Sequence, residues 1–123
     1  MAPTVTCMSL MSIPYMRGWL REFLNEPYKH EGGANWFNAS SHTLFGLPLQ
    51  DVFISDGSSE YMFVGVLFKA PVDKVMAAVD AAGSGKFVPG DAPGKYLSAS
   101  GAVALAYQGT MSKLYCAGTV NPR

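Results

Sequence analysis

The stretch Glu60–Lys69, with the sequence EYMFVGVLFK, decides the fold. Within it, Tyr61–Phe68 is the longest apolar run of the chain at 8 residues, far short of the roughly 20 that a membrane-spanning helix needs. The near absence of polar alternation indicates a strand that is covered on both faces, so we predict the central strand of a sheet here. Just before it, the Asp-Gly of DGSS (Asp56–Ser59) is a strong hairpin signal. DVFIS (Asp51–Ser55) is the predicted partner strand.

Two segments with helical spacing of apolar residues are predicted to pack on this sheet. Ser12–Glu26 carries one apolar stripe, and Pro27 ends the predicted helix. Ala70–Gly83 is the clearer of the two, because Pro71 fits a first turn and the terminal glycine fits a left-handed C-terminal cap.

The rest of the chain holds two glycine-rich segments and a second hairpin. Tyr28–His42 predicts a long surface loop, and Gly83–Lys95 predicts an irregular segment because it contains four glycines and two prolines. Gly101–Gly109 and Met111–Thr119 are predicted strands that turn at Gly109–Thr110. The predicted fold is a single domain over residues 1–123 of the α+β class: an antiparallel sheet of about four to five strands with two helices packed against it.

The composition limits the classes of partner. Nine Lys and Arg balance nine Asp and Glu, so no net field directs the protein to nucleic acid or to an anionic membrane. Hydrophobic residues make up 49% of the chain and charged residues 15%, against a usual charged fraction of about 25%. This composition rules out disorder and predicts a rather apolar surface. A partner, if there is one, is not chosen by bulk charge.

The only two cysteines, Cys7 and Cys116, lie near opposite ends of the chain in extended-looking segments. We expect them to form a disulfide, and the chain-entropy model assigns so long a loop up to about 4.7 kcal/mol. Two buried thiols are the alternative. A bridge fits an oxidising compartment, and the start MAPTVTC reads as an added Met before a mature Ala2. The expected location is therefore periplasmic or secreted, with a leader removed.

No catalytic residue, metal site or cofactor is predicted. A cysteine nucleophile would pair Cys7 or Cys116 with His30 or His42 as its base. Neither cysteine begins a predicted helix, however, where the dipole would lower its pKa. The two histidines and Glu31 do not have the tight spacing of metal ligands. We therefore expect a protein that is not an enzyme.

The two glycine-rich segments contain the predicted partner-binding residues. The first presents two adjacent aromatic residues between asparagines, Trp36 and Phe37. The second presents an apolar tip with orienting polar side chains, from Lys86, Phe87, Asp91 and Lys95. Exposed aromatic residues among polar ones are typical of anchors for a protein partner. The alternative is that these aromatic rings fold back and cap the core.

The C-terminal segment YLSASGAVALAYQGTMSKLYCAGT (Tyr96–Thr119) combines a Ser-Gly-Ala element with a strand that contains LYC. In these residues the chain resembles the periplasmic inhibitors of c-type lysozyme, whose Ser-Gly loop enters the cleft of the enzyme. The resemblance implies an inhibitory role for Ser100 and Gly101.

In overall type the chain is also similar to the immunity proteins that protect Gram-negative bacteria from type VI secreted peptidoglycan amidases. Those proteins are small, neutral and periplasmic, and they plug the Cys-His cleft of their toxin. The two resemblances together imply a periplasmic inhibitor or immunity protein that inserts a loop into a peptidoglycan-degrading enzyme. Its partner would be that secreted cell-wall hydrolase. The alternative is a small-molecule or lipid-binding α+β domain with an apolar pocket between sheet and helices.

Overall fold

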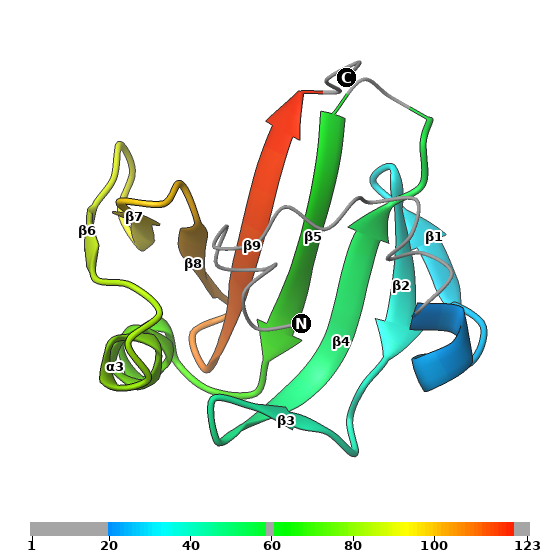
Figure 1. Cartoon of the computed structure of the whole chain (residues 1–123), viewed down its shortest axis with the longest axis horizontal. Helices are drawn as coiled ribbons and strands as arrows, with labels where there is room; N and C mark the ends of the chain where they lie inside the picture. The colour runs from blue at the N-terminus through cyan, green and yellow to red at the C-terminus, as the bar shows by residue number, and fades with distance from the viewer. Residues whose placement is uncertain (1–19, 59–60, 120–123) are drawn as a thin grey trace.

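The computed structural model describes residues 20–58 and 61–119, and a large antiparallel sheet dominates them (Figure 1). The sheet follows the order β1-β2-β4-β5-β9-β8-β7-β6, and β3 pairs with β4 outside this path. In chain order its strands are β1 (Lys29–Glu31), β2 (Ala34–Asn38), β3 (Thr43–Leu44), β4 (Leu47–Ser55), β5 (Tyr61–Phe68), β6 (Phe87–Pro89), β7 (Lys95–Ser98), β8 (Val103–Tyr107) and β9 (Met111–Thr119).

The predicted α+β class is therefore wrong. The described residues form nine strands, instead of about four to five, and only two short helical segments: α3 (Val72–Ala81) and a helical turn over residues 20–24. The additional strands come from the two glycine-rich segments that were expected to be loops. In the first, Gly32 and Gly33 adopt φ of 63° and 77°, so they provide the two left-handed residues of a tight hairpin turn between β1 and β2. In the second, β6 pairs with β7.

The most regular predictions are confirmed. β4 and β5 form the expected hairpin, and β5 lies inside the sheet between β4 and β9. Both faces of β5 are covered, because Val66 is 0% exposed and Leu67, which points the other way, is 6% exposed. The helix predicted over Ala70–Gly83 is α3, and β8 and β9 form the C-terminal hairpin.

The first predicted helix, Ser12–Glu26, lies mostly outside the described residues. Its described end is helical over residues 20–24. Asn25 then adopts a left-handed φ of 71°, which is a common way for a helix to end. Among the described residues, no helix has the length and apolar character needed to cross a membrane.

Side chains alternate between the two faces of the sheet, and α3 lies on one of them, which we call the core face. Val75 and Val79 of α3 are fully buried there. The hydroxyl of Ser112 on β9 donates a hydrogen bond of 2.7 Å to the carbonyl of Ala70 and fixes the start of the helix. The strands contribute mainly aliphatic residues and alanine to this core: Val52, Ile54, Val64, Val66, Phe68, Ala104 and Leu114.

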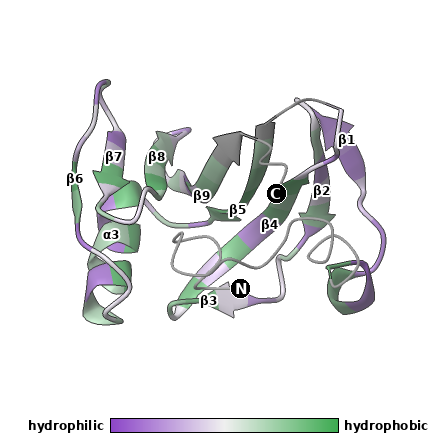
Figure 2. Ribbon diagram, turned by 45° about the horizontal axis from the view of Figure 1, so that its top comes forward, coloured by the Kyte–Doolittle hydropathy of each residue, from purple (hydrophilic) through white to green (hydrophobic). Residues whose placement is uncertain are grey.

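The two ends of the described sheet differ in character. β1 (Lys29–Glu31) is hydrophilic and β6 (Phe87–Pro89) is hydrophobic, as Figure 2 shows. Each of these strands has only three residues. The length of the sheet thus comes from β4, β5 and β9, which lie side by side in Figure 1.

Candidate functional site

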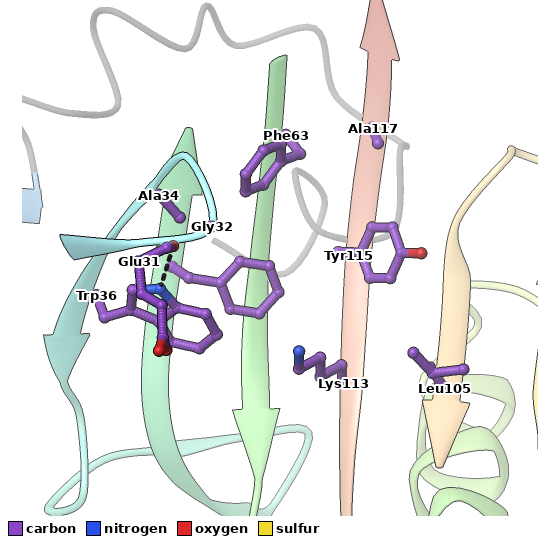
Figure 3. Close-up of a pocket in the computed structure, with 10 residues that line it drawn as sticks. Glu31, Gly32, Ala34, Trp36, Phe63, Leu105, Lys113, Tyr115 and Ala117 are labelled. Atoms are coloured by element: carbon purple, nitrogen blue, oxygen red, sulfur yellow. Dashed lines mark hydrogen bonds between the residues drawn. The ribbon is translucent and has the colours of Figure 1, made fainter. Parts of the chain in front are cut away.

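The candidate site lies on the face of the sheet opposite α3, which we call the aromatic face. It is a cavity of about 420 Å³. Residues from β1, β2, β4, β5, β8 and β9 and from the β1–β2 turn surround this cavity, which Figure 3 shows in close-up. Its lining consists of Glu31, Gly32, Ala34, Trp36, Phe53, Phe63, Leu105, Lys113, Tyr115 and Ala117.

Strand register brings the aromatic residues together. Trp36 on β2 is paired with Phe53 on β4, Phe53 with Gly65 on β5, and Gly65 with Tyr115 on β9. Residues paired across antiparallel strands point to the same face. These four residues therefore form one row across the sheet, and Phe63 lies two residues along β5 from the glycine.

Gly65 explains how the row packs. A Cβ atom at this position would lie 2.5 Å from Phe53 Cζ, 2.5 Å from Tyr115 Cβ and 2.8 Å from the carbonyl oxygen of Leu114. The absence of a side chain therefore lets the Phe53 ring lie across β5, where it is only 5% exposed. From there its ring centroid is 4.7 Å from that of Trp36 and 6.4 Å from that of Tyr115. Phe53 forms the floor of the cavity.

The Trp36 indole is held in place from several directions. Its Nε1 donates a hydrogen bond of 3.1 Å to the carbonyl oxygen of Glu31, the dashed line in Figure 3. The Phe53 ring packs against the indole. The ammonium groups of Lys29 and Lys113 lie 4.7 Å and 5.5 Å from the centroid of the indole. Contacts of this kind are favourable because the ring face carries partial negative charge.

Lys113 projects from β9 into aromatic surroundings. Its Nζ lies 4.7 Å from the centroid of Tyr107 and 5.8 Å from that of Phe53, in addition to its contact with Trp36. Burial lowers the pKa of Lys113, the charge of Lys29 lowers it further, and the carboxylate of Glu31 acts in the opposite direction. Lys29 itself forms an ion pair of 3.4 Å with Glu31.

A buried carboxylate lies beside this site. Asp51 on β4 is 3% exposed and accepts a hydrogen bond of 2.5 Å from the hydroxyl of Tyr28. Its other oxygen accepts no hydrogen bond within the described ranges. Burial, followed by the hydrogen bond to Asp51, raises the pKa of Tyr28 to about 12. The pair joins the segment before β1 to the middle of the sheet.

A second cavity, of about 150 Å³, lies on the core face. It is lined by the helical turn at residues 20–24, by β3 and by β4, and its lining is almost entirely apolar. The ring of His42 packs there against Phe23, with 5.1 Å between the ring centroids. An apolar pocket between sheet and helices was the alternative function. This cavity lies in such a place, but it is much smaller than the cavity on the aromatic face.

The two predicted binding residues of the first glycine-rich segment point to opposite faces of the sheet. Trp36 lines the aromatic cavity, whereas its neighbour Phe37 points to the core face and is 1% exposed. A partner cannot reach the Phe37 ring. For this residue the alternative holds, because its ring is part of the core.

The predicted binding residues of the second segment lie at the opposite end of the sheet from Trp36. Lys86 is exposed, but the Phe87 ring packs against the core. Asp91 and Lys95 form an ion pair of 3.2 Å. Ser100 lies in the β7–β8 connection, where its hydroxyl is 3.0 Å from that of Ser98. These residues do not converge on one site with Trp36.

Cys116 lies on β9, paired with Val64 on β5. The described part of the chain contains no free cysteine. Cys7 lies outside the described residues, so its pairing with Cys116 stays a prediction.

The cavity depends on Phe53, Lys113 and Tyr115, which were not predicted as site residues. Alternation along β4 and β9 places them on the face opposite the core. This alternation is the feature of the sequence from which they could have been identified. Within residues 20–58 and 61–119, no group of three or more His, Cys, Asp or Glu residues is arranged to hold a metal ion. What the cavity offers to a ligand is flat apolar contacts and one or two ammonium groups.

Comparison with protein-family models, with curated proteins and with solved structures finds no match to this chain.

Proposed function

We propose that this protein is a binding protein that holds a small organic ligand in the cavity of the aromatic face. One observation carries the proposal: Trp36, Phe53, Phe63 and Tyr115 line a concave space of about 420 Å³. Ligand sites are typically cavities of about 300–1,000 Å³ with mostly apolar walls and a few placed polar groups.

The rigidity of the walls supports the same function. The indole of Trp36 is fixed by its hydrogen bond to Glu31, and the Phe53 ring is wedged over Gly65. A site whose side chains are already ordered loses little conformational entropy when a ligand arrives. The half-buried rings would lose their remaining contact with water, which favours binding by roughly 25 cal/mol per Å² of apolar surface.

The inhibitor function implied by the resemblances has less support from the geometry. It requires a projecting loop, but Phe87, the expected apolar tip, is directed toward the core. Among the described residues, the exposed large apolar side chains at that end of the sheet are Val88, at 61% exposure, and its strand partner Leu97, at 37%. The periplasmic location and the cell-wall hydrolase partner stay predictions.

A fragment screen by ¹⁵N-labelled NMR tests the proposal. The library contains aromatic acids, aromatic amines, neutral aromatic compounds, fatty acids and simple sugars. We expect at least one class to shift the Trp36 indole signal and the amide signals of Lys113 and Tyr115. Trp36→Ala should abolish these shifts. Val88→Ser, at the far end of the sheet, is the matched control and should leave them unchanged.

Two results would contradict the proposal. One is a screen in which no class perturbs the cavity. The other is inhibition of a purified peptidoglycan amidase or lysozyme that depends on Lys86 and Val88 and is unaffected by Trp36→Ala, which would favour the inhibitor function instead.

A further inference from the structure

We infer that the ligand of the aromatic cavity is an organic anion with a flat, aromatic body, and that Lys113 binds its acidic group. This inference rests on the proposed function and adds the chemical class of the ligand. It depends on three features of the cavity: its local charge, the shape of its walls and its shortage of hydrogen-bonding groups.

The local charge is positive although the whole chain is neutral. Lys29 and Lys113 both lie over the Trp36 ring, and Glu31 is the carboxylate that lines the cavity. Two ammonium groups and one carboxylate leave a formal charge of +1. Glu31 already forms an ion pair with Lys29.

Lys113 is therefore the cation that a ligand can neutralise. Within the described ranges it forms no ion pair, and its charged group is surrounded by the rings of Trp36, Phe53 and Tyr107. Asp51, a further carboxylate on this face, is paired with Leu67, which in turn is paired with Lys113, so it lies two strands away. Its Oδ2 accepts the Tyr28 hydroxyl.

Burying an ammonium group is unfavourable unless something compensates its lost hydration. Aromatic faces compensate part of this cost, and an incoming carboxylate would compensate the rest through a charge-assisted hydrogen bond. A ligand ammonium would instead be repelled by Lys113 and Lys29. The charges of the cavity thus select an anion.

The walls select a flat body. Trp36 and Tyr115 come from strands on either side of β4 and β5. The Phe53 ring contacts both of their rings and forms the floor between them. Phe63 lies farther along β5 (Figure 3). Aromatic pairs in offset or edge-to-face geometry gain about 0.5–1.5 kcal/mol beyond simple burial of area. An aliphatic chain would not gain this part.

The cavity offers few partners to a polyhydroxylated ligand. The Trp36 N–H is already donated to the Glu31 carbonyl. The other side-chain hydrogen-bonding groups of the lining are Lys113, the Tyr115 hydroxyl and the Glu31 carboxylate. A sugar with more hydroxyl groups than these can serve would leave some without partners on leaving water, and each such group is costly. At about 420 Å³, the cavity lies near the small end of ligand sites, so a compact aromatic acid fits better than a long lipid.

Isothermal titration of the full chain with four probes tests the inference. The probes are 2-naphthoate, its neutral analogue 2-naphthylmethanol, its cationic analogue 2-naphthylmethylamine, and decanoate. We expect 2-naphthoate to bind at least about tenfold more tightly than each of the other three, which corresponds to about 1.4 kcal/mol. Lys113→Gln should remove the preference for the acid over the alcohol.

Lys95→Gln is the matched control, because Lys95 already pairs with Asp91 at the other end of the sheet. It should not alter the preference. Equal or tighter binding of the alcohol or the amine, lost in Trp36→Ala, would overturn the inference and leave the proposed function intact. If decanoate bound as tightly as 2-naphthoate, the inference that the ligand has an aromatic body would be wrong. Failure of every probe to bind, together with an empty fragment screen, would overturn both.

Discussion

The core face and the aromatic face are built from alternate residues of the same strands, yet they are filled by different kinds of side chain. On the core face, Val66, Phe68 and Leu114 are each 0% exposed and belong to one hydrophobic cluster with the buried valines of α3. On the aromatic face, Trp36 and Tyr115 remain half-buried, and the ammonium group of Lys113 lies over the rings of Trp36, Phe53 and Tyr107.

The two kinds of side chain suit different tasks: the aliphatic residues of the core face stabilise the fold, and the partly exposed rings of the aromatic face suit the proposed binding of a ligand. Aliphatic side chains that interdigitate with a helix lose all their contact with water during folding, which stabilises the fold. Among the described residues, large rings left partly exposed next to a charged group retain surface that a ligand can cover. The composition of each face therefore indicates its role, although both belong to one sheet.

The largest expected effect comes from a matched pair of leucines, one on each face. Leu114 is 0% exposed on the core face, whereas Leu105 is half-buried at the rim of the cavity. Leu114→Ala should lower the free energy of unfolding by about 2–5 kcal/mol, because it leaves a cavity in a packed core. Leu105→Ala should lower it by less than about 1 kcal/mol. Urea denaturation measures both, and equal losses would show that the aromatic face is part of the core.

The expected bridge between Cys7 and Cys116 would sharpen the comparison, because Val64, the partner of Cys116 in the sheet, belongs to the core. Reduction should lower the free energy of unfolding by about 2–4 kcal/mol. Intact mass of the native protein should be two hydrogens below that of the reduced chain. A variant with both cysteines changed to serine should not respond to reductant. Two thiols that alkylate in native, oxidised protein would contradict the prediction.

Gly65→Ala addresses the floor of the aromatic face. The added methyl would meet Phe53, Tyr115 and the carbonyl oxygen of Leu114 at 2.5–2.8 Å. We expect a loss of about 1–3 kcal/mol, typical of overpacking, and a changed near-ultraviolet circular dichroism spectrum as the Phe53 ring moves. Phe53→Leu in the same background should restore part of the loss. An unchanged spectrum and stability would mean that the ring is not wedged over the glycine.

The smallest expected effect concerns the Tyr28 hydroxyl. Tyr28→Phe removes the hydrogen bond to the buried Asp51, and we expect a loss of about 1 kcal/mol. Tyr96→Phe is the control, since the Tyr96 hydroxyl forms no hydrogen bond to another side chain in the described ranges.

The same variant has an expected pH dependence. The pKa of Tyr28 is raised from 10.0 to about 12, so the folded state favours the protonated phenol. This contribution is complete below pH 10 and is lost as the pH rises toward 12. The stability gap between the wild type and Tyr28→Phe should therefore shrink over that interval, as followed by denaturation at a series of pH values. A gap that stays constant would place the stabilisation elsewhere.

The sequence predicted those parts of the fold that have strong periodicity. β4, β5, α3 and the β8–β9 hairpin were predicted correctly because each carries its own pattern and its own turn or cap. β1, β2, β6 and β7 were missed. They are short and lie within the two glycine-rich segments or, for β7, at the end of the second one. They form strands because a neighbouring strand offers hydrogen bonds, a context that local propensity does not contain.

The candidate site was predictable only in part, for a related reason. Trp36 stood out as an aromatic residue in a polar segment. Its closeness to Lys113 depends on three successive strand pairings, from β2 to β4, β5 and β9. Each pairing has a register that the sequence does not display, and a shift of one residue would turn every side chain to the other face. Phe87, at the other end of the sheet, was predicted to be a loop tip because the sequence does not reveal that β6 pairs with β7.

The short outer strands bear on how the protein behaves at high concentration. An outer strand presents unpaired backbone groups to which another chain can add, and short, charged or proline-containing strands hinder this addition. Of the described strands, β1 consists of Lys29, His30 and Glu31, and β6 ends in Pro89, which has no N–H to donate. The long apolar β5 is enclosed between β4 and β9. The two short outer strands therefore hinder edge-to-edge pairing through the charges of β1 and the proline of β6, and the apolar β5 is kept away from both edges.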